Sequence, residues 1–171
     1  MTSTMHPIET FTPVRAANQR DVLSLTLPPL RLLRVAFVGV GARGRQAVMR
    51  WCHIPGVEIV AVCDSVKSTA EEVSRQVAQL GKPRPTVFSG EDWLSHVPIA
   101  IHAMQNRKNV AVEVPAALSL KDIWQLIDTA ERTQQHCMML ENTVYDDFEM
   151  AVEKMAKKGL FGELIHAEGG Y

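Results

Sequence analysis

Three glycines between an apolar run and a helix-forming stretch constrain the fold of this chain more than any other feature. Residues 34–39 form a short apolar run, which is typical of a strand buried in a parallel sheet. Gly39, Gly41 and Gly44 have G-x-G-x-x-G spacing, and a helix is expected over residues 43–52. The first glycine allows a tight turn, the second allows a phosphate to approach the backbone, and the third allows close helix–strand packing. The pattern predicts the first strand–turn–helix unit of a dinucleotide-binding fold.

Asp64 closes a second apolar run, residues 57–63, and extends this prediction. A carboxylate at that position can accept hydrogen bonds from an adenosine ribose, and it would repel the 2′-phosphate of NADP. The N-terminus of the helix offers unpaired N–H groups to the diphosphate. We therefore expect NAD as the cofactor. The alternative is an ordinary strand–helix–strand unit in which Asp64 only caps the next helix, residues 65–80, and one residue can serve both roles.

Strand and helix patterns alternate from Arg34 onward. The expected strands are 34–39, 57–63, 86–88, 110–113 and 137–140, and the expected helices are 43–52, 65–80, 96–106, 120–134 and 146–158. This alternation predicts an α/β fold, a Rossmann-type doubly wound parallel sheet over residues 34–145. Residues 1–33 are expected to be an N-terminal extension, extended or disordered over 1–21 and then an arm whose leucines need a cover.

The last segment departs from the alternation. Residues 163–168 alternate polar and apolar side chains, as in a strand of an antiparallel sheet with one face in water. A single such strand cannot stabilise itself. Residues 146–171 are therefore expected to hold a linking helix and only the first strand of a truncated C-terminal α+β domain.

Composition excludes several classes of protein. Net charge is −1 over 171 residues, so there is no overall basic field to attract nucleic acid or a membrane surface. The three cysteines have no C-x-x-C spacing, which favours a reducing compartment, and Cys63 and Cys137 are expected to be buried thiols. The six histidines show no paired metal spacing, and no metal is expected. The first residues show no secretory signal, which favours a cytoplasmic protein. A homo-oligomer is compatible with this composition.

Longer motifs add a resemblance to these patterns. The stretch RVAFVGVGARG, the CD pair at positions 63–64 and the segment from NVAVEVP to GELIHAEGGY are similar to the Gfo/Idh/MocA family. Within it, the chain resembles glycoside hydrolase family 109, the NAD-dependent α-N-acetylgalactosaminidases, over residues 22–171. The resemblance implies that NAD transiently oxidises C3 of a terminal N-acetylgalactosamine, that elimination expels the aglycone, and that water and hydride then add back. It also implies a longer protein, with most of the substrate-binding sheet beyond this chain.

The same resemblance implies site residues. Ala42 and Arg43 would lie in the diphosphate loop, Asp64 at the ribose, and Glu113 and Val114 along the nicotinamide half. The remaining implied residues are Trp93, Leu94, Ser95, His96 and Asn142 for the cofactor and Tyr171 for the substrate. For each residue the alternative is a cap, a turn or a packing role, most of all for Asn142.

Two departures qualify this assignment. Sugar dehydrogenases of the family have Glu-Lys-Pro where this chain has Glu113-Val114-Pro115, and valine cannot transfer a proton, which favours the hydrolase subfamily over a dehydrogenase. Near Trp93, two Asp-Trp turns of the family are merged into one, with a loss of roughly twenty residues that hold a strand beside the first one. We therefore expect weak NAD binding or aggregation. An ordinary sugar dehydrogenase and a non-catalytic protein that keeps the fold remain the rival hypotheses.

Overall fold

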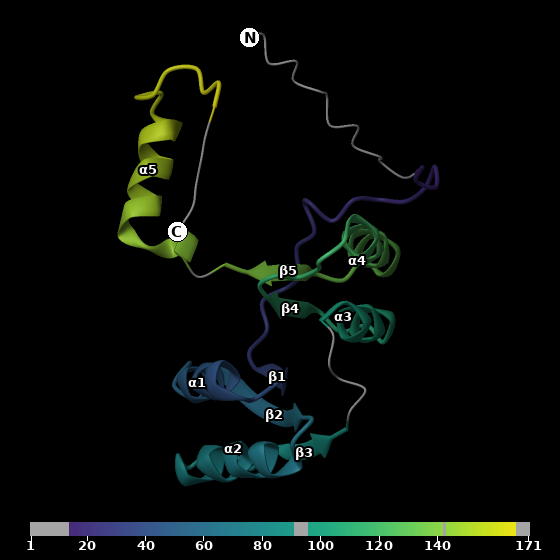
Figure 1. Ribbon diagram of the computed structural model, residues 1–171, viewed down its shortest axis with the longest axis vertical. Coiled ribbons are helices and arrows are strands. Elements are labelled where there is room, and N and C mark those ends of the chain that lie inside the picture. Colours follow the sequence, from purple (N-terminus) through teal and green to yellow (C-terminus); the bar gives the residue numbers. More distant parts are fainter. Residues whose placement is uncertain (1–13, 91–95, 142, 167–171) are drawn as a thin grey trace, which may run out of the picture.

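A computed structural model describes residues 14–90, 96–141 and 143–166 and shows the alternation of strands and helices (Figure 1). Its strands are β1 (Leu33–Val38), β2 (Val57–Asp64), β3 (Thr86–Ser89), β4 (Val110–Glu113) and β5 (Cys137–Leu140). Its helices are α1 (Ala42–Trp51), α2 (Lys67–Gln79), α3 (His96–Gln105), α4 (Leu120–Thr133) and α5 (Asp147–Lys157), with a 3-10 turn η2 (Thr143–Tyr145). Each predicted element up to α5 exists, with bounds that differ from the prediction by two residues at most.

The strands form two parallel sheets. One has the order β1-β2-β3, and the other pairs β4 with β5. Helices α1 and α2 lie on one side of the strands, and α3 and α4 lie on the other side, next to β4 and β5 (Figure 1). This arrangement confirms the doubly wound α/β fold. Among the described residues no strand pairs with both β1 and β4, so the sheet is divided where the sequence predicts a missing strand.

Each sheet has its own hydrophobic core. The first core contains Val40, Val48, Cys52, Ile59, Val62, Ala70, Val73 and Val77. The second contains Val97, Ala100, Met104, Val112, Leu126 and Ala130. Trp51 packs edge-on against Phe37, with ring centroids 5.6 Å apart, at the border of the first core. Both cores are small because, among the described residues, only α1 and α2 pack on the first sheet and only α3 and α4 on the second.

The cysteines are free thiols, as predicted. Cys52 and Cys63 are buried, and Cys137 is half-buried at the start of β5. Burial raises the pKa of all three thiols above the usual value, and at Cys63 the negative charge of Asp64 adds to the rise in pKa. These thiols therefore stay protonated at neutral pH and are poor nucleophiles.

The extension makes contacts that the sequence does not predict. Residues 14–21 were expected to be extended or disordered, but Arg15 and Gln19 contact the buried Glu131 of α4. Residues 14–21 form no helix or strand, as expected of an extended segment, and their contacts with α4 join residues more than a hundred positions apart, so local polarity gave no sign of them. The expected cover over the arm's leucines is absent from the described part of the chain, where Leu23 is 94% exposed.

The end of the chain also differs from its prediction. Residues 163–166 form no strand, and 167 and 168 lie outside the described residues. A strand needs hydrogen-bonding partners, and the described residues provide none for this segment.

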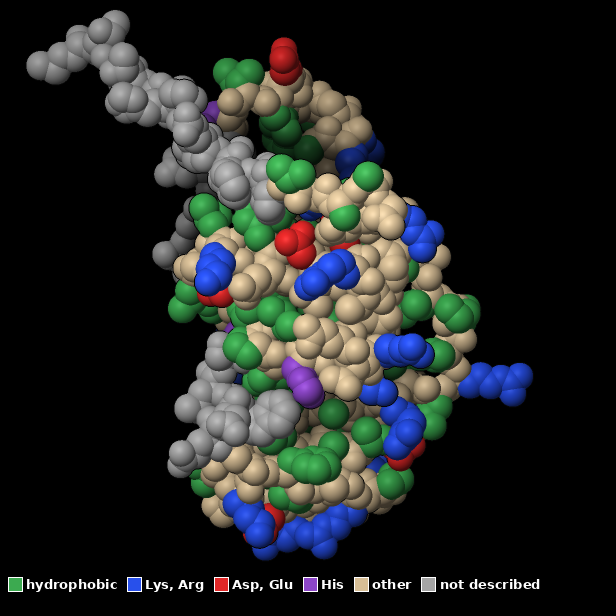
Figure 2. Space-filling view, turned by 90° about the vertical axis from the view of Figure 1, so that its right-hand side faces the viewer, with side chains coloured by type: hydrophobic (Ala, Val, Ile, Leu, Met, Phe, Trp, Pro, Cys, Tyr) green, Lys and Arg blue, Asp and Glu red, His purple; other side chains and the backbone are tan. Residues whose placement is uncertain are grey.

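Helix α5 and the residues around it expose large apolar side chains, including Tyr145, Phe148 and Ile165. Hydrophobic side chains are also scattered over the side of the molecule that bears α3 and α4 (Figure 2).

Candidate functional site

The glycine turn between β1 and α1 has the geometry that its spacing predicts. Gly39 has a φ of 81°, in the left-handed region that side chains disfavour. A Cβ on Gly44 would lie 2.0 Å from the carbonyl oxygen of Gly39, so helix and strand meet at a distance that only glycine permits. A Cβ on Gly41 would meet no atom within 4 Å. The turn is therefore closely packed on the protein side and open at Gly41, where a ligand can approach the backbone.

The N-terminus of α1 faces the same opening. Gly41 is its N-cap residue and provides no side-chain cap, and the first helical hydrogen bond runs from the Arg45 N–H to the Gly41 carbonyl at 2.8 Å. The N–H groups of Ala42, Arg43 and Gly44 precede that bond and have no partner within the helix. With the positive end of the helix dipole they form a site for an anion such as a diphosphate.

Asp64 points toward the glycine turn. Its Oδ2 accepts a hydrogen bond from the Val40 N–H at 2.9 Å, and its Oδ1 accepts one from the Val66 N–H at 3.0 Å. The N-cap residue of α2 is Val66, so Asp64 is not the N-cap itself, but its bond to the Val66 N–H also ties it to the start of that helix. The carboxylate at the same time ties the end of β2 to the turn after β1. Each oxygen keeps a lone pair that can accept a hydrogen bond from a ribose hydroxyl.

A second group of predicted residues lies at the end of β4. Arg43 Nη1 is 3.0 Å from Glu113 Oε1, an ion pair that joins α1 to β4 across the divided sheet. Both side chains are largely exposed, at 74% and 40%, so the pair adds little to stability and can open for a ligand. His96 Nδ1 donates a hydrogen bond to the Pro115 carbonyl at 3.0 Å, beside the half-buried Val114. The Arg43–Glu113 ion pair connects this group to the glycine turn.

Other predicted site residues lie outside the described part of the chain: Trp93, Leu94, Ser95, Asn142 and Tyr171. No cluster of three potential metal ligands occurs among the residues that the structure describes. Sequence reasoning missed the Val40 N–H and the Pro115 carbonyl as partners of Asp64 and His96. Every residue has a backbone N–H or carbonyl group, so the residue type does not reveal which of these groups will bind a side chain. Only the register of the strands could have indicated these two partners.

Comparison with known proteins identifies the family. A family model described as an oxidoreductase family with an NAD-binding Rossmann fold, Gfo/Idh/MocA, matches residues 33–141. The chain belongs to the Gfo/Idh/MocA family. Its NAD-binding Rossmann domain thus includes β1 to β5, the glycine turn and Asp64. The open backbone at Gly41 and the uncapped start of α1 fit the diphosphate of NAD.

Curated relatives support the subfamily. The chain is 45% identical to glycosyl hydrolase family 109 protein 1 of Phocaeicola vulgatus and 43% identical to the protein of the same name from Bacteroides thetaiotaomicron. It is matched over 96% of its length in both comparisons and spans 39% and 40% of those relatives. Both alignments extend over 185 residues, more than the 171 of this chain, so the relatives have internal residues without a counterpart here. The gap agrees with the predicted loss of a strand.

Solved structures agree on the fold. Myo-inositol 2-dehydrogenase from Lactobacillus plantarum has a TM-score of 0.66 at 21% identity, covering 78% of this chain and 43% of that chain. Scyllo-inositol dehydrogenase from Lactobacillus casei, solved with bound NAD(H) and scyllo-inositol, has a TM-score of 0.67 at 15% identity, covering 77% of this chain and 43% of that chain. No helix among the described residues is long and apolar enough to cross a membrane.

Asp64→Asn tests the role of the carboxylate at the turn. The variant keeps the shape of the side chain, but its NH2 group would face one of the two backbone N–H donors, so we expect a loss of about 1–2 kcal/mol of stability. Without the negative charge, the preference for NAD over NADP should fall by about tenfold, or 1.4 kcal/mol. Calorimetric titration with both dinucleotides measures this ratio. Asp146→Asn, at the start of α5, is the matched control, and an equal effect of both variants would contradict the assignment.

Proposed function

We propose that this chain is the nucleotide-binding part of an NAD-dependent glycosidase that acts on substrates with a terminal α-N-acetylgalactosamine. The observation that carries the proposal is Val114, which lies between Glu113 and Pro115 at the end of β4. The names of the curated relatives support the same subfamily. A valine there leaves the nicotinamide edge without a lysine to exchange a proton with a sugar hydroxyl.

The residues of this chain hold and orient the cofactor in the proposal. The N–H groups of Ala42, Arg43 and Gly44 bind the diphosphate, and Asp64 accepts hydrogen bonds from the adenosine ribose. Glu113 and Val114 border the nicotinamide, and Glu113 also fixes the Arg43 side chain through their ion pair. Bound NAD supplies a reversible hydride acceptor for C3 of the sugar. The proton transfers then depend on residues outside this chain, which spans about two fifths of its relatives.

Six further assignments belong to the same proposal. Trp93, Leu94, Ser95 and Asn142 would border the cofactor, and Tyr171 would contact the sugar. His96 would act through Pro115, because its ring N–H holds the carbonyl of the residue that follows Val114. The positions of these residues in the family's motifs support the assignments. For His96, the hydrogen bond to Pro115 is further support.

A sugar dehydrogenase is the second candidate. The observation that favours it is the likeness of the fold to two inositol dehydrogenases, with TM-scores of 0.66 and 0.67. The two candidates share the nucleotide site and differ in the fate of the hydride. A dehydrogenase releases NADH in proportion to product, whereas the proposed glycosidase returns the hydride before the product leaves.

A chimera separates the candidates. This chain would replace the matching N-terminal part of the Phocaeicola vulgatus relative and be assayed with 4-nitrophenyl α-N-acetylgalactosaminide. We expect NAD-dependent release of nitrophenol, no net NADH, and uptake of solvent deuterium at C2 of the sugar. NADH formed in step with product would favour the dehydrogenase. Nitrophenol release without deuterium uptake would contradict the elimination. The intact relative, assayed in parallel, is the control for folding and assay conditions.

A further inference from the structure

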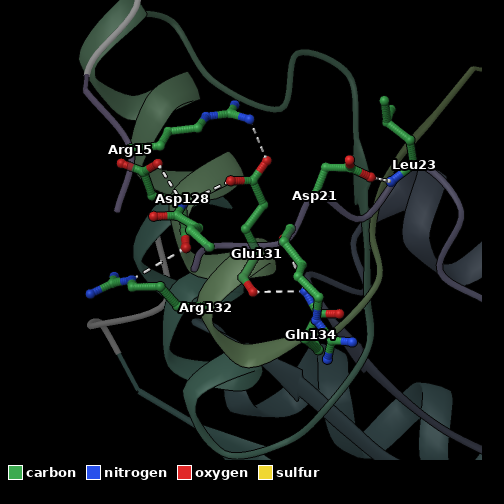
Figure 3. Close-up of polar contacts among 9 residues, drawn as sticks. Arg15, Asp21, Leu23, Asp128, Glu131, Arg132 and Gln134 are labelled. Carbon is green, nitrogen blue, oxygen red and sulfur yellow. Dashed lines mark hydrogen bonds and ion pairs between the residues drawn. The ribbon is translucent and has the colours of Figure 1, made fainter. Parts of the chain in front are cut away.

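A buried carboxylate on α4 finds its partners on the N-terminal arm. The side chain of Glu131 is 3% exposed, and its Oε1 lies 2.8 Å from Arg15 Nη1. Its Oε2 accepts a hydrogen bond from Gln19 Nε2 at 2.7 Å. Figure 3 shows the Arg15 guanidinium pointing toward the Glu131 carboxylate. Burial of a carboxylate is costly unless it is paired and hydrogen-bonded, and here both oxygens are satisfied by residues of the arm. The contact is thus a specific docking site for residues 14–22, which we call the arm clamp.

Other contacts fix the arm clamp to one stripe of α4. The Arg15 guanidinium lies 5.7 Å from the centroid of the Trp124 ring, and Gln19 Nε2 also reaches Asp128 Oδ1 at 3.3 Å. At the end of the helix, Gln134 Nε2 donates to the Arg20 carbonyl at 3.1 Å. These helix positions are spaced by three and four residues, so they share one face. That face is used by the arm, while Leu126 and Ala130 face the core.

Val22 links the arm clamp to the edge where the cofactor is expected. It packs on the second core together with Ala116 and Ala117, and it lines a hollow of about 330 Å³ whose wall includes Pro115. Pro115 directly follows Val114 and receives the hydrogen bond from His96. Val22 and the loop after β4 therefore border the same hollow and pack on the same core, and α3 contacts the loop through His96.

We propose that the arm clamp positions the loop that follows β4, so that Glu113 and Val114 are held against the nicotinamide half of the cofactor. The inference rests on the proposed placement of these two residues at the nicotinamide. The arm itself acts through Val22 and the loop and does not contact the cofactor. Since the glycine turn and Asp64 lie on the other sheet, the adenosine half should be independent of the arm.

Titration with two ligands tests the inference. ADP-ribose has the adenosine and diphosphate of NAD but no nicotinamide. Arg15→Met leaves Glu131 buried without its cation, so the arm should detach, and trypsin should cleave faster after Arg20. We expect the affinity for NAD to fall about tenfold, while the affinity for ADP-ribose stays within a factor of about two.

Two further variants control this experiment. Arg132→Met makes the same change on α4, but Arg132 bonds to Asp128 and Thr129 of its own helix, so both affinities should stay unchanged. Combining Arg15→Met with Glu131→Gln removes the buried charge and should restore part of the NAD affinity.

Three results would overturn the inference. The first is an equal loss of affinity for NAD and for ADP-ribose in Arg15→Met. The second is a detached arm in that variant with unchanged NAD affinity. The third is that the unmodified chain binds the two ligands with equal affinity. Failure of the glycosidase assay, with the ligand difference intact, would refute the proposed function and leave the arm clamp standing.

Discussion

Replacing Gly44 with alanine is expected to disrupt the glycine turn and abolish NAD binding. The added Cβ would lie 2.0 Å from the Gly39 carbonyl oxygen, a backbone atom that cannot move without shifting β1 or α1. Overpacking of this kind costs about 1–3 kcal/mol, and relief by opening the turn would separate the N–H groups that receive the diphosphate. Urea unfolding monitors the loss of stability, and calorimetry monitors the loss of NAD binding.

Gly41→Ala is the matched control in the same turn. Its Cβ would meet no atom of the protein within 4 Å, and its φ of −63° suits alanine, so stability should change by no more than about 0.5 kcal/mol. The methyl group nevertheless enters the space where the diphosphate is expected, so NAD affinity should fall by at least about tenfold. A Gly41→Ala variant that binds NAD normally would place the ligand elsewhere.

Restoring the missing strand is expected to raise both the cooperativity of unfolding and the affinity for NAD. In the described part of the chain, β1 and β4 each have an edge without a partner strand, and the two cores contain eight and six buried residues. A strand between them would pair both edges and join the cores into one. Because the urea m-value scales with the surface exposed on unfolding, it should increase. NAD affinity should rise at least about tenfold, since the glycine turn and the end of β4 would be held at a fixed distance from each other.

The experiment inserts, between Trp93 and Leu94, the segment of the Phocaeicola vulgatus relative that has no counterpart here. A Gly/Ser segment of equal length at the same place is the control, because it lengthens the connection and forms no strand. Sub-micromolar NAD binding by the unmodified chain as a soluble monomer would contradict the expectation of a weakened site. An equal gain from the Gly/Ser segment would show that the length of the connection, not strand pairing, limits binding.

Local sequence signals determined the elements of this fold. Ser119 accepts a hydrogen bond from the Asp122 N–H at 3.1 Å and begins α4, as its residue type predicts. Gly81 and Gly159, with φ of 74° and 71°, follow the ends of α2 and α5. The glycine turn, and the position of the Asp64 carboxylate beside it, were also predictable from the sequence. Each of these features depends on side-chain chemistry within a few residues or on one strand–helix–strand unit, and such chemistry is visible in the sequence.

Tertiary structure alone decided the features that join distant parts of the chain. The alternating pattern of residues 163–166 predicts a strand, but a strand needs neighbours to hydrogen-bond, and the described residues supply none. The polar arm predicts an extended or disordered segment, but its pairing of Arg15 and Gln19 with the buried Glu131, more than a hundred positions away, left no signal in the sequence. The Arg43–Glu113 pair likewise exists only because α1 and the end of β4 come together. Such contacts depend on which surfaces meet after folding, and a linear pattern of residue types does not contain that information.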